Sequence, residues 1–185
     1  MKQSYILFFL SFITLSFTAC NSDDDDTTTA WKHQNDAVYN AVKADTTWMP
    51  LPSDTIAGWP KGVYYKALPN SDDDDKGTEH PFHTANVTVI YKGYFVNNAN
   101  DLEGTTTFAA EGKTTFLVGG FNRGFSIALQ NMYIGDKWQI CIPYYLGYGI
   151  ARCGAIPADS TLFFDVEFIE IEHYPECNNV FSESV

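Results

Sequence analysis

The sequence has little positive charge and few cysteines, and both shortages limit the functions open to it. Lys and Arg number 11 against 23 Asp and Glu, which gives a formal net charge of -12. Because phosphate binding needs a basic face, this balance argues against nucleic acid as a partner. The cysteine spacings match no zinc pattern, and the chain offers no Ser-His-Asp set. We therefore expect a function that needs neither a bound metal nor a polar catalytic triad.

The acidic residues and the histidines also lack the arrangement of a metal site. The aspartates at 72–75 are consecutive, without the spaced ligands and turn glycine of an EF-hand loop, so we interpret them as a solvated loop. His80, His83 and His173 are scattered along the chain. We expect no metal and no cofactor.

The first 19 residues have the pattern of a signal peptide. Lys2 precedes an apolar run from Tyr5 to Phe17 that is too short for a membrane span, and small residues precede Cys20. The Ala-Cys junction resembles a bacterial lipobox, in which the cysteine is acylated. The alternative is a plain secretory peptide with an incidental cysteine.

Residues 20–30 continue this pattern with an acidic linker. Four aspartates directly behind Cys20 resemble the export signal of Bacteroidota surface lipoproteins. The resemblance implies a palmitate-type lipid on Cys20 and tethering to a membrane of the cell envelope. We expect an outer-membrane lipoprotein, with an outward-facing position as one alternative.

Three further cysteines, Cys141, Cys153 and Cys177, remain for disulfide chemistry. An oxidising compartment permits one pair and leaves one thiol free. The sequence does not fix the pairing; we favour Cys153 with Cys177, because both lie in loop-like segments.

Hydrophobic spacing predicts two helices. In residues 31–44, Trp31, Val38 and Val42 share one helical stripe, so residues 31–61 form an N-terminal extension of helix and loop. A second helix lies in the segment RGFSIALQNMYIGD, which Gly135 ends. Its apolar residues recur at i, i+3, i+4 and i+7: Phe125, Ala128, Leu129 and Met132.

Alternation predicts five strands, at 62–68, 87–96, 114–120, 137–143 and 161–172. In the last strand the apolar phase shifts between Phe168 and Ile169, which predicts a bulge. Residues 69–84 are interpreted as a long polar loop and residues 97–113 as an Asn-, Thr- and Gly-rich excursion. With one helix between the third and fourth strands, the pattern favours an α+β domain whose helix covers one face of a mostly antiparallel sheet.

Four segments, in this order and nearly without gaps, resemble the FKBP family of peptidyl-prolyl cis-trans isomerases: VTVIYKGYF, TTFLVGGFNRGFSIALQNMYIGDKWQICIP, YLGYG and AIPADSTLFFDVEFIEIE. The resemblance covers roughly Gly62 to Glu172. It implies an isomerase domain at 62–173, followed by a tail at 174–185. The implied fold is a five-stranded, mostly antiparallel twisted sheet wrapped on one short helix, with the N-terminal helix as an extension.

The chemistry of this family explains the lack of polar catalytic residues. Rotation about an X-Pro bond breaks no bond, and its barrier of roughly 18–20 kcal/mol comes from resonance across the C–N bond. A dry aromatic cup for the proline ring and donors placed for the twisted carbonyl are therefore enough, because only interactions stronger in the transition state accelerate the step.

The resemblance also implies the residues of the site. Carried over position by position, it gives a substrate-binding pocket lined by Tyr91, Phe108, Phe121, Asn122, Phe125, Tyr148, Ile156 and Phe164. Three of these are implied to serve catalysis: Tyr148 through its hydroxyl, Asn122 through its backbone N–H, and Tyr91 as a pocket wall.

The sequence departs from the family pattern at several of these places. Phe125 stands where the family usually has a Trp floor, and Asn122 replaces an Ile. Ala109 follows Phe108 where an Asp is expected, with Asp101 as an alternative carboxylate. The loop from Gly149 to Gly154 is shorter by one residue than the family's.

Three functions are consistent with these residues. The first is a prolyl isomerase that assists folding of envelope or surface proteins, with X-Pro segments of unfolded or partly folded proteins as substrates and FKBP-type macrolides as inhibitors. The second is a low-activity module that binds proline peptides or proteins in the same cup. The third is a surface lipoprotein whose N-terminal helix and acidic loop contact a partner, with the FKBP core as scaffold.

Overall fold

The computed structural model describes residues 23–52, 61–69, 77–98 and 101–172. Several sequence predictions fall outside these ranges: the signal peptide at 1–19, the lipidation residue Cys20, the aspartates at 72–75, His173, Cys177 and the tail at 174–185. Within the described ranges, no helix has the length and apolar character that a bilayer crossing needs.

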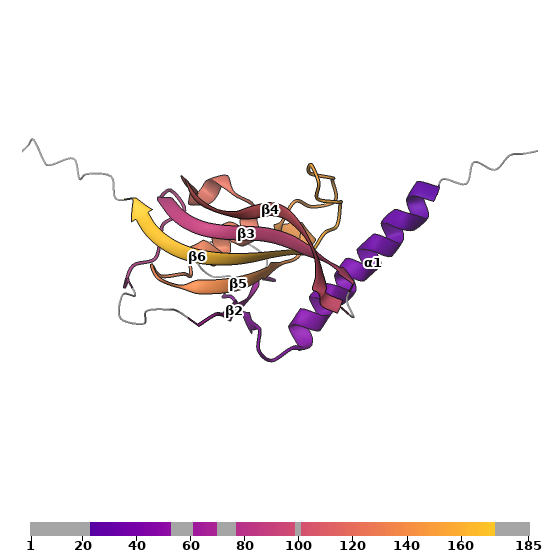
Figure 1. Ribbon diagram of the computed structural model, residues 1–185, viewed down its shortest axis with the longest axis horizontal. Coiled ribbons are helices and arrows are strands. Elements are labelled where there is room, and N and C mark those ends of the chain that lie inside the picture. Colours follow the sequence, from indigo (N-terminus) through magenta and orange to yellow (C-terminus); the bar gives the residue numbers. More distant parts are fainter. Residues whose placement is uncertain (1–22, 53–60, 70–76, 99–100, 173–185) are drawn as a thin grey trace, which may run out of the picture.

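Six strands form one sheet in the spatial order β1-β2-β5-β6-β3-β4 (Figure 1). The strands are β1 (Met49–Pro50), β2 (Tyr64–Ala67), β3 (Asn86–Asn98), β4 (Asp101–Leu117), β5 (Lys137–Ile142) and β6 (Leu162–Glu172). Every neighbouring pair is antiparallel, as predicted. The sixth strand is the short β1, which the surrounding prolines predicted as loop. Its position at the sheet edge tolerates Pro50, because an edge residue need not donate to a further strand.

The largest correction concerns β4, because most of the predicted excursion at 97–113 is strand. β4 pairs with β3 along its length, from Asn98↔Asp101 to Asn86↔Leu117, with register shifts near Gly93. β4 is an edge strand, so its many threonines face solvent on an extended backbone that β-branched residues favour. The predicted strand at 114–120 ends at Leu117 and continues as the 3-10 turn η2 (Val118–Gly120).

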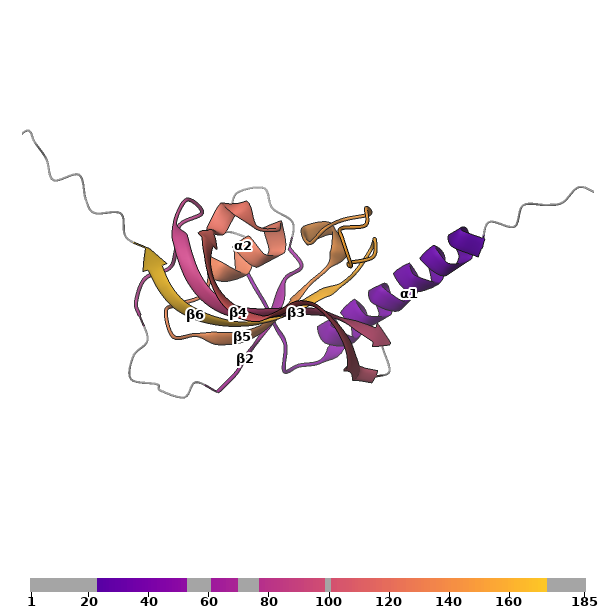
Figure 2. The ribbon, with the colours of Figure 1, turned by 45° about the horizontal axis from the view of Figure 1, so that its top comes forward.

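The helix α2 (Arg123–Leu129) covers one face of the sheet, as Figure 2 shows. Every residue from Gly124 to Leu129 is buried. A Cβ on Gly124 would clash with the Ile142 side chain of β5, so glycine lets the helix approach the sheet closely. The helix ends before the predicted Gly135, but Met132 remains fully buried because the chain continues in tight turns.

The main core lies between α2 and this inner face of the sheet. It is built by the alternating residues of the long strands, including Val87, Val89, Ile140, Phe164, Val166 and Phe168. β6 has the predicted bulge: Thr88 pairs with Glu170 and Val89 with Phe168, so Ile169 is the additional residue. The slip lets Ile171 point into the core again.

The N-terminal helix α1 (Asp23–Ala44) packs against the outer face of the sheet. Its Val38 and Val42 join Tyr94, Cys141 and Phe163 in a second apolar cluster. The N-terminal half of α1 extends beyond the sheet in both views (Figures 1 and 2). The predicted helix is confirmed, but it begins at Asp23, within the predicted linker. Negative charge favours a helix N-terminus, which is consistent with an acidic run at this position.

The described cysteines are both free thiols. Cys141 is buried in β5 with its side chain in the second cluster, and burial raises its pKa above the usual range. Cys153 is exposed in the loop after η3 (Tyr144–Leu146). The predicted partner of Cys153, Cys177, lies outside the described residues.

Candidate active site

Four predicted aromatic residues meet at the N-terminal end of α2. Phe125 and Phe164 are fully buried, with ring centroids 4.8 Å apart. Phe121 lies over Phe125 at 4.6 Å, and Tyr91 lies 5.8 Å from both Phe121 and Phe125. Phe121 and Tyr91 are only partly buried, so this cluster of rings has a buried side and a partly exposed side; we call it the aromatic cup.

The local structure explains why these rings converge. Tyr91 on β3 and Phe164 on β6 share the inner face of two paired strands, with Tyr91 opposite Val166 and Gly93 opposite Phe164. Phe121 and Phe125 are four residues apart across the start of α2, so their rings meet on one side.

One member of the cup was missed by sequence reasoning. Phe116 of β4 lies 5.1 Å from Phe121 and 5.9 Å from Phe125. The available signal was alternation, because Phe116 is two residues from the buried Val118 and therefore points to the same side.

Phe108, a predicted pocket residue, lies beside the aromatic cup. Its ring lies 5.6 Å from Phe164 in an edge-on arrangement. It rests over Gly93, where an added Cβ would come within 2.5 Å of Phe108 Cε2 and 3.1 Å of Phe164 Cε1. The absence of a side chain at position 93 is therefore what lets Phe108 reach the cup.

The predicted alternative carboxylate, Asp101, is not part of the site. Asp101 pairs with Asn98 at the far end of the β3–β4 hairpin. Asp101 is seven residues along β4 from Phe108, or about 23 Å. Ala109 pairs with Gly93 beside the cup, so the position after Phe108 carries no carboxylate.

Asn122 caps α2 and places its amide at the rim. Its Oδ1 accepts the backbone N–H of Phe125 at 2.9 Å, which fixes the side chain. Its Nδ2 is buried without a hydrogen-bond partner. Within the described part of the chain, the backbone N–H of Asn122 has no backbone acceptor in the surrounding turns. The side-chain Nδ2 is shielded from solvent.

Tyr148 is half-buried against the main core. Burial raises the pKa of its hydroxyl, and the nearby Asn122 amide opposes part of this rise. The Asn122 amide thus lies near the Tyr148 hydroxyl and affects its pKa, although Nδ2 does not make a hydrogen bond of good geometry with it. A tyrosine hydroxyl is protonated at neutral pH at its ordinary pKa, and the upward shift keeps it so; Tyr148 can therefore donate a hydrogen bond.

Ile156 completes the predicted wall at the end of a tight loop. It is buried, and it exchanges backbone hydrogen bonds of 2.9 and 3.0 Å with Cys153. Gly149 and Gly154 have φ of 76° and 58°, which lets the short loop turn. The loop exposes Ile150 at its tip and brings Ile156 back to the core cluster that Tyr148 also contacts.

The structure thus brings together apolar walls and neutral donors. None of the eight predicted site residues carries a charge, and the two fully buried rings, Phe125 and Phe164, exclude water from the floor. Such a cup can take a proline ring, while Tyr148 and Asn122 can donate to the carbonyl groups beside it. Nothing in it favours bond cleavage.

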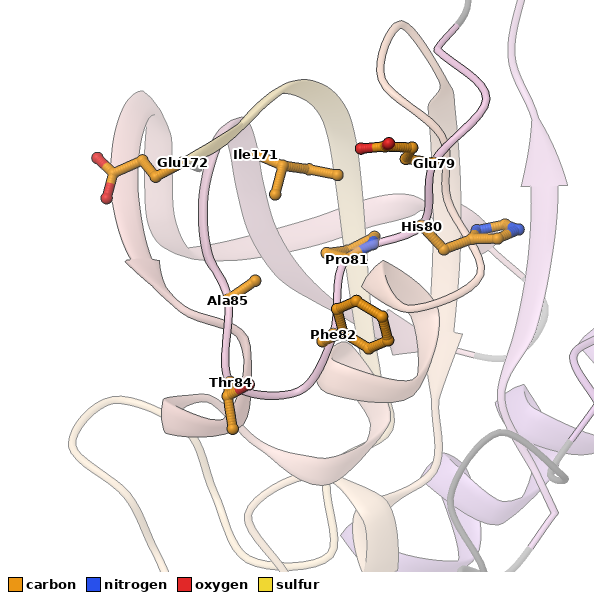
Figure 3. Close-up of a pocket in the computed structure, with 8 residues that line it drawn as sticks. All are labelled: Glu79, His80, Pro81, Phe82, Thr84, Ala85, Ile171 and Glu172. Atoms are coloured by element: carbon orange, nitrogen blue, oxygen red, sulfur yellow. The ribbon is translucent and has the colours of Figure 1, made fainter. Parts of the chain in front are cut away.

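A separate cavity of about 570 Å³ lies elsewhere on the molecule (Figure 3). It is lined by Glu79, His80, Pro81, Phe82, Thr84, Ala85, Ile171 and Glu172, none of which is a predicted site residue. Ile171 is seven residues along β6 from Phe164, or about 23 Å. The His80 ring is turned away and held by Met132 O at 3.1 Å and by stacking on Tyr133.

Several proteins are similar in sequence to this domain. FkpA of Escherichia coli, an FKBP-type peptidyl-prolyl cis-trans isomerase, is 31% identical over 100 residues, which are 54% of this chain and 36% of that protein. The macrophage infectivity potentiator of Trypanosoma cruzi is 47% identical over 60 residues, 32% of this chain and 31% of that protein. The isomerase FKBP14 of Mus musculus is 30% identical over 97 residues, or 51% of this chain, and the chain spans only 46% of its length.

Solved structures agree on the fold. A peptidyl-prolyl cis-trans isomerase of Pseudomonas syringae superposes with a TM-score of 0.61 at 24% identity, covering 80% of this chain and 96% of that one. FkpA of Escherichia coli superposes with a TM-score of 0.58 at 23% identity, covering 82% and 63%. The predicted FKBP-like fold is confirmed. Because the family model for FKBP-type peptidyl-prolyl cis-trans isomerases also matches residues 77–169, half of the chain, this protein belongs to that family.

Proposed function

We propose that the protein is a peptidyl-prolyl cis-trans isomerase that acts through its aromatic cup. The observation that carries the proposal is the meeting of Tyr91, Phe121, Phe125 and Phe164 around a floor without solvent access. Membership in the family supports the same activity.

In this mechanism the cup binds the proline ring and removes water from the amide. Water hydrogen bonds favour the planar, charge-separated form of the amide, so a dry site lowers the barrier to rotation. As the bond twists, the nitrogen lone pair leaves conjugation, so the nitrogen becomes a better hydrogen-bond acceptor and the carbonyl oxygen a weaker one. In this proposal, Tyr148 Oη and the Asn122 backbone N–H donate to carbonyl groups of the flanking residues and hold the X-Pro bond at the cup. Each gain of about 1.4 kcal/mol in the twisted state is tenfold in rate.

The substrates we propose are X-Pro segments of unfolded or partly folded proteins. Two neutral donors and apolar walls recognise a proline and its carbonyls without demanding a charge. The partly exposed rings of Tyr91 and Phe121 offer apolar surface that suits an extended segment of a larger chain. With a signal-type N-terminus and Cys20 as the lipid attachment point, these substrates are proteins of the cell envelope, and the enzyme is tethered at the outer membrane.

A coupled X-Pro peptide assay at low temperature tests the activity. We expect the cis-to-trans rate to rise in proportion to protein concentration and to return to the uncatalysed rate when an FKBP-type macrolide is added. A rate that stays at the uncatalysed value throughout would rule the isomerase out. Metabolic labelling with palmitate, which we expect to be lost in Cys20→Ala, tests the tether separately.

A second candidate, a binding module with little turnover, is favoured by one observation. The position after Phe108 is Ala109, so the carboxylate expected there is missing. In this case a proline peptide would bind in calorimetric titration, while the same sample would fail to accelerate isomerisation. Introducing the carboxylate with Ala109→Asp would then raise the rate, whereas an already active enzyme would change little.

A further inference from the structure

The helix α1 reaches past the outer face of the sheet to the loop that carries Ile156. Asn35 of α1 is 1% exposed, and its Oδ1 accepts the backbone N–H of Thr161 at 2.8 Å. The backbone carbonyl of Asn35 accepts the Thr161 hydroxyl at 3.1 Å. Because Thr161 is buried, its N–H would cost about 1–3 kcal/mol if it lost this partner.

Trp31, one turn earlier in α1, contacts two segments, the loop before β6 and strand β3. Its indole N–H donates to Ser160 Oγ at 3.3 Å, beside Thr161. Its ring meets Phe95 edge-on at 5.4 Å. Asn35 Nδ2 donates to the Trp31 carbonyl at 3.0 Å, which ties the two residues together.

Phe95 links Trp31 to the aromatic cup. It stacks on Phe108 with centroids 6.4 Å apart, and Phe108 in turn meets Phe164 at 5.6 Å. Phe108 lies on β4, the edge strand, so no further strand of the described sheet supports it on that side. The ring of Phe95, held by Trp31, is therefore part of what fixes Phe108 over Gly93.

We propose that α1 positions the open side of the cup, with Asn35 and Trp31 as positioning residues for the loop from Ile156 to Thr161 and for Phe108. This proposal rests on the proposed isomerase function of the cup. Neither residue touches the substrate. Asn35 sets where the loop returns to β6, and Trp31 sets the position of the Phe95–Phe108 pair.

The alternative is that α1 only covers the apolar outer face. Apolar covering is the role of a different part of the helix, because Val42, seven residues after Asn35, packs in the second cluster with Cys141 and Phe163. Val42→Ala therefore removes packing from the same helix without touching Thr161. It is a matched control for loss of stability.

The experiment compares Asn35→Ala, Asn35→Asp and Val42→Ala in the full chain. Asn35→Ala and Asn35→Asp both lose the bond to the Trp31 carbonyl, but only Asn35→Asp keeps an acceptor for the Thr161 N–H. One buried hydrogen bond corresponds to about a tenfold effect, so we expect kcat/KM to fall about tenfold in Asn35→Ala. We expect Asn35→Asp to recover most of it and Val42→Ala to keep the wild-type value despite a lower Tm.

Amide hydrogen exchange provides a readout that does not need turnover. We expect exchange at Thr161 to be accelerated about tenfold or more in Asn35→Ala, and to be unchanged in Val42→Ala measured at equal distance below its Tm. If Asn35→Ala does not fold, Trp31→Phe is the milder variant, because it keeps an aromatic ring at this position while it loses the indole N–H and part of the ring contact with Phe95.

Equal changes of kcat/KM in Asn35→Ala and Val42→Ala, or no recovery in Asn35→Asp, would overturn the proposal. If the wild-type protein lacks turnover, the isomerase function fails, and exchange at Thr161 alone decides whether α1 positions the loop. Unchanged exchange in Asn35→Ala, or in Trp31→Phe where that variant is used, contradicts the positioning role.

Discussion

The inner face of the sheet buries large aromatic rings against a short helix, whereas the outer face combines a small apolar cluster with a polar network under a long helix. On the inner face, Phe125, Phe164 and Phe168 are among the largest fully buried side chains. On the outer face, Gln139 donates to Tyr94 Oη at 2.7 Å and to Asp165 at 3.1 Å. Phe164 and Phe168 of the inner set and Asp165 of the outer set come from the same strand, β6.

This difference shows how one sheet separates two tasks. Alternation along a strand sends neighbouring residues to opposite faces, so Phe164 enters the cup while Phe163 packs with α1 and Asp165 lies on the same outer face. The inner face is held by apolar packing. On the other side, apolar packing of α1 is joined by hydrogen bonds from Asn35 and Trp31 to the loop before β6. Four predictions test this division.

The largest effect is expected from breaking the inner face. Phe164→Ala should destabilise the protein by about 3–5 kcal/mol, because it removes a fully buried ring and leaves a cavity. Val38→Ala on the outer face should cost less, about 1–3 kcal/mol. Urea unfolding of both variants measures the contrast. Equal losses would mean that the two faces contribute alike.

A change at the rim should separate activity from stability. Tyr148→Phe removes a half-buried hydroxyl and leaves the ring, so we expect the free energy of unfolding to change by less than about 1 kcal/mol. The rate in the X-Pro peptide assay should fall about tenfold, the worth of one hydrogen bond to the twisted amide. Tyr145→Phe, at an exposed position outside the cup, is the control. A full rate in Tyr148→Phe would remove this hydroxyl from the mechanism.

Two substitutions of Asn122 divide its roles as a cap and as a donor. Asn122→Ala should cost about 1 kcal/mol of stability, because Phe125 N–H loses its acceptor. Asn122→Asp keeps that acceptor but replaces the unpartnered Nδ2 with an oxygen, so the Tm should stay near wild type while kcat/KM falls. Thermal melts and the peptide assay on the same samples measure both. A wild-type rate in Asn122→Asp would mean that the side-chain amide does not contribute to the rate, and that the backbone N–H is the only donor of Asn122.

The smallest effect is expected at alkaline pH and belongs to the outer face. Burial and then the neighbouring Asp165 raise the pKa of Tyr94 well above its usual value, and burial followed by a hydrogen bond to Tyr145 does the same for Tyr39. Below a pH of about 10 both states keep these hydroxyls protonated. Above it the unfolded chain ionises first, so stability is lost as the pH rises. We expect the stability lost between about pH 8.5 and a pH above about 10, measured by urea unfolding, to be smaller in Tyr94→Phe than in wild type. This interval spans the ordinary tyrosine pKa.

The parts of the fold that the sequence predicted are those with regular local patterns. The helical spacing around Phe125 and the phase shift at Ile169 appear correctly in the structure. The likeness of ordered segments to one family also located the rings that meet in the cup. Each of these signals depends on residues close together in the chain.

The parts that the sequence did not predict depend on edges and on distant contacts. The part of β4 before residue 114 was missed, because its exposed threonines and glycines look like a loop. Phe116 lies in the part that was predicted as strand, but it was not assigned to the site. The bond between Asn35 and Thr161 joins residues 126 positions apart, and no local pattern marks either of them as a partner. The unpartnered Nδ2 of Asn122 likewise becomes visible only once its Oδ1 is fixed.

Gly93 offers a genetic use of this architecture. Its backbone does not have a positive φ, so alanine can adopt the conformation, and the strand pairing of β3 can remain. The added methyl group would instead displace Phe108 from its place over the cup. A cell that carries Gly93→Ala would therefore keep the protein and its α1 surface while losing the formed pocket. Comparing this allele with a complete deletion would separate phenotypes that come from isomerisation from those that come from the presence of the protein.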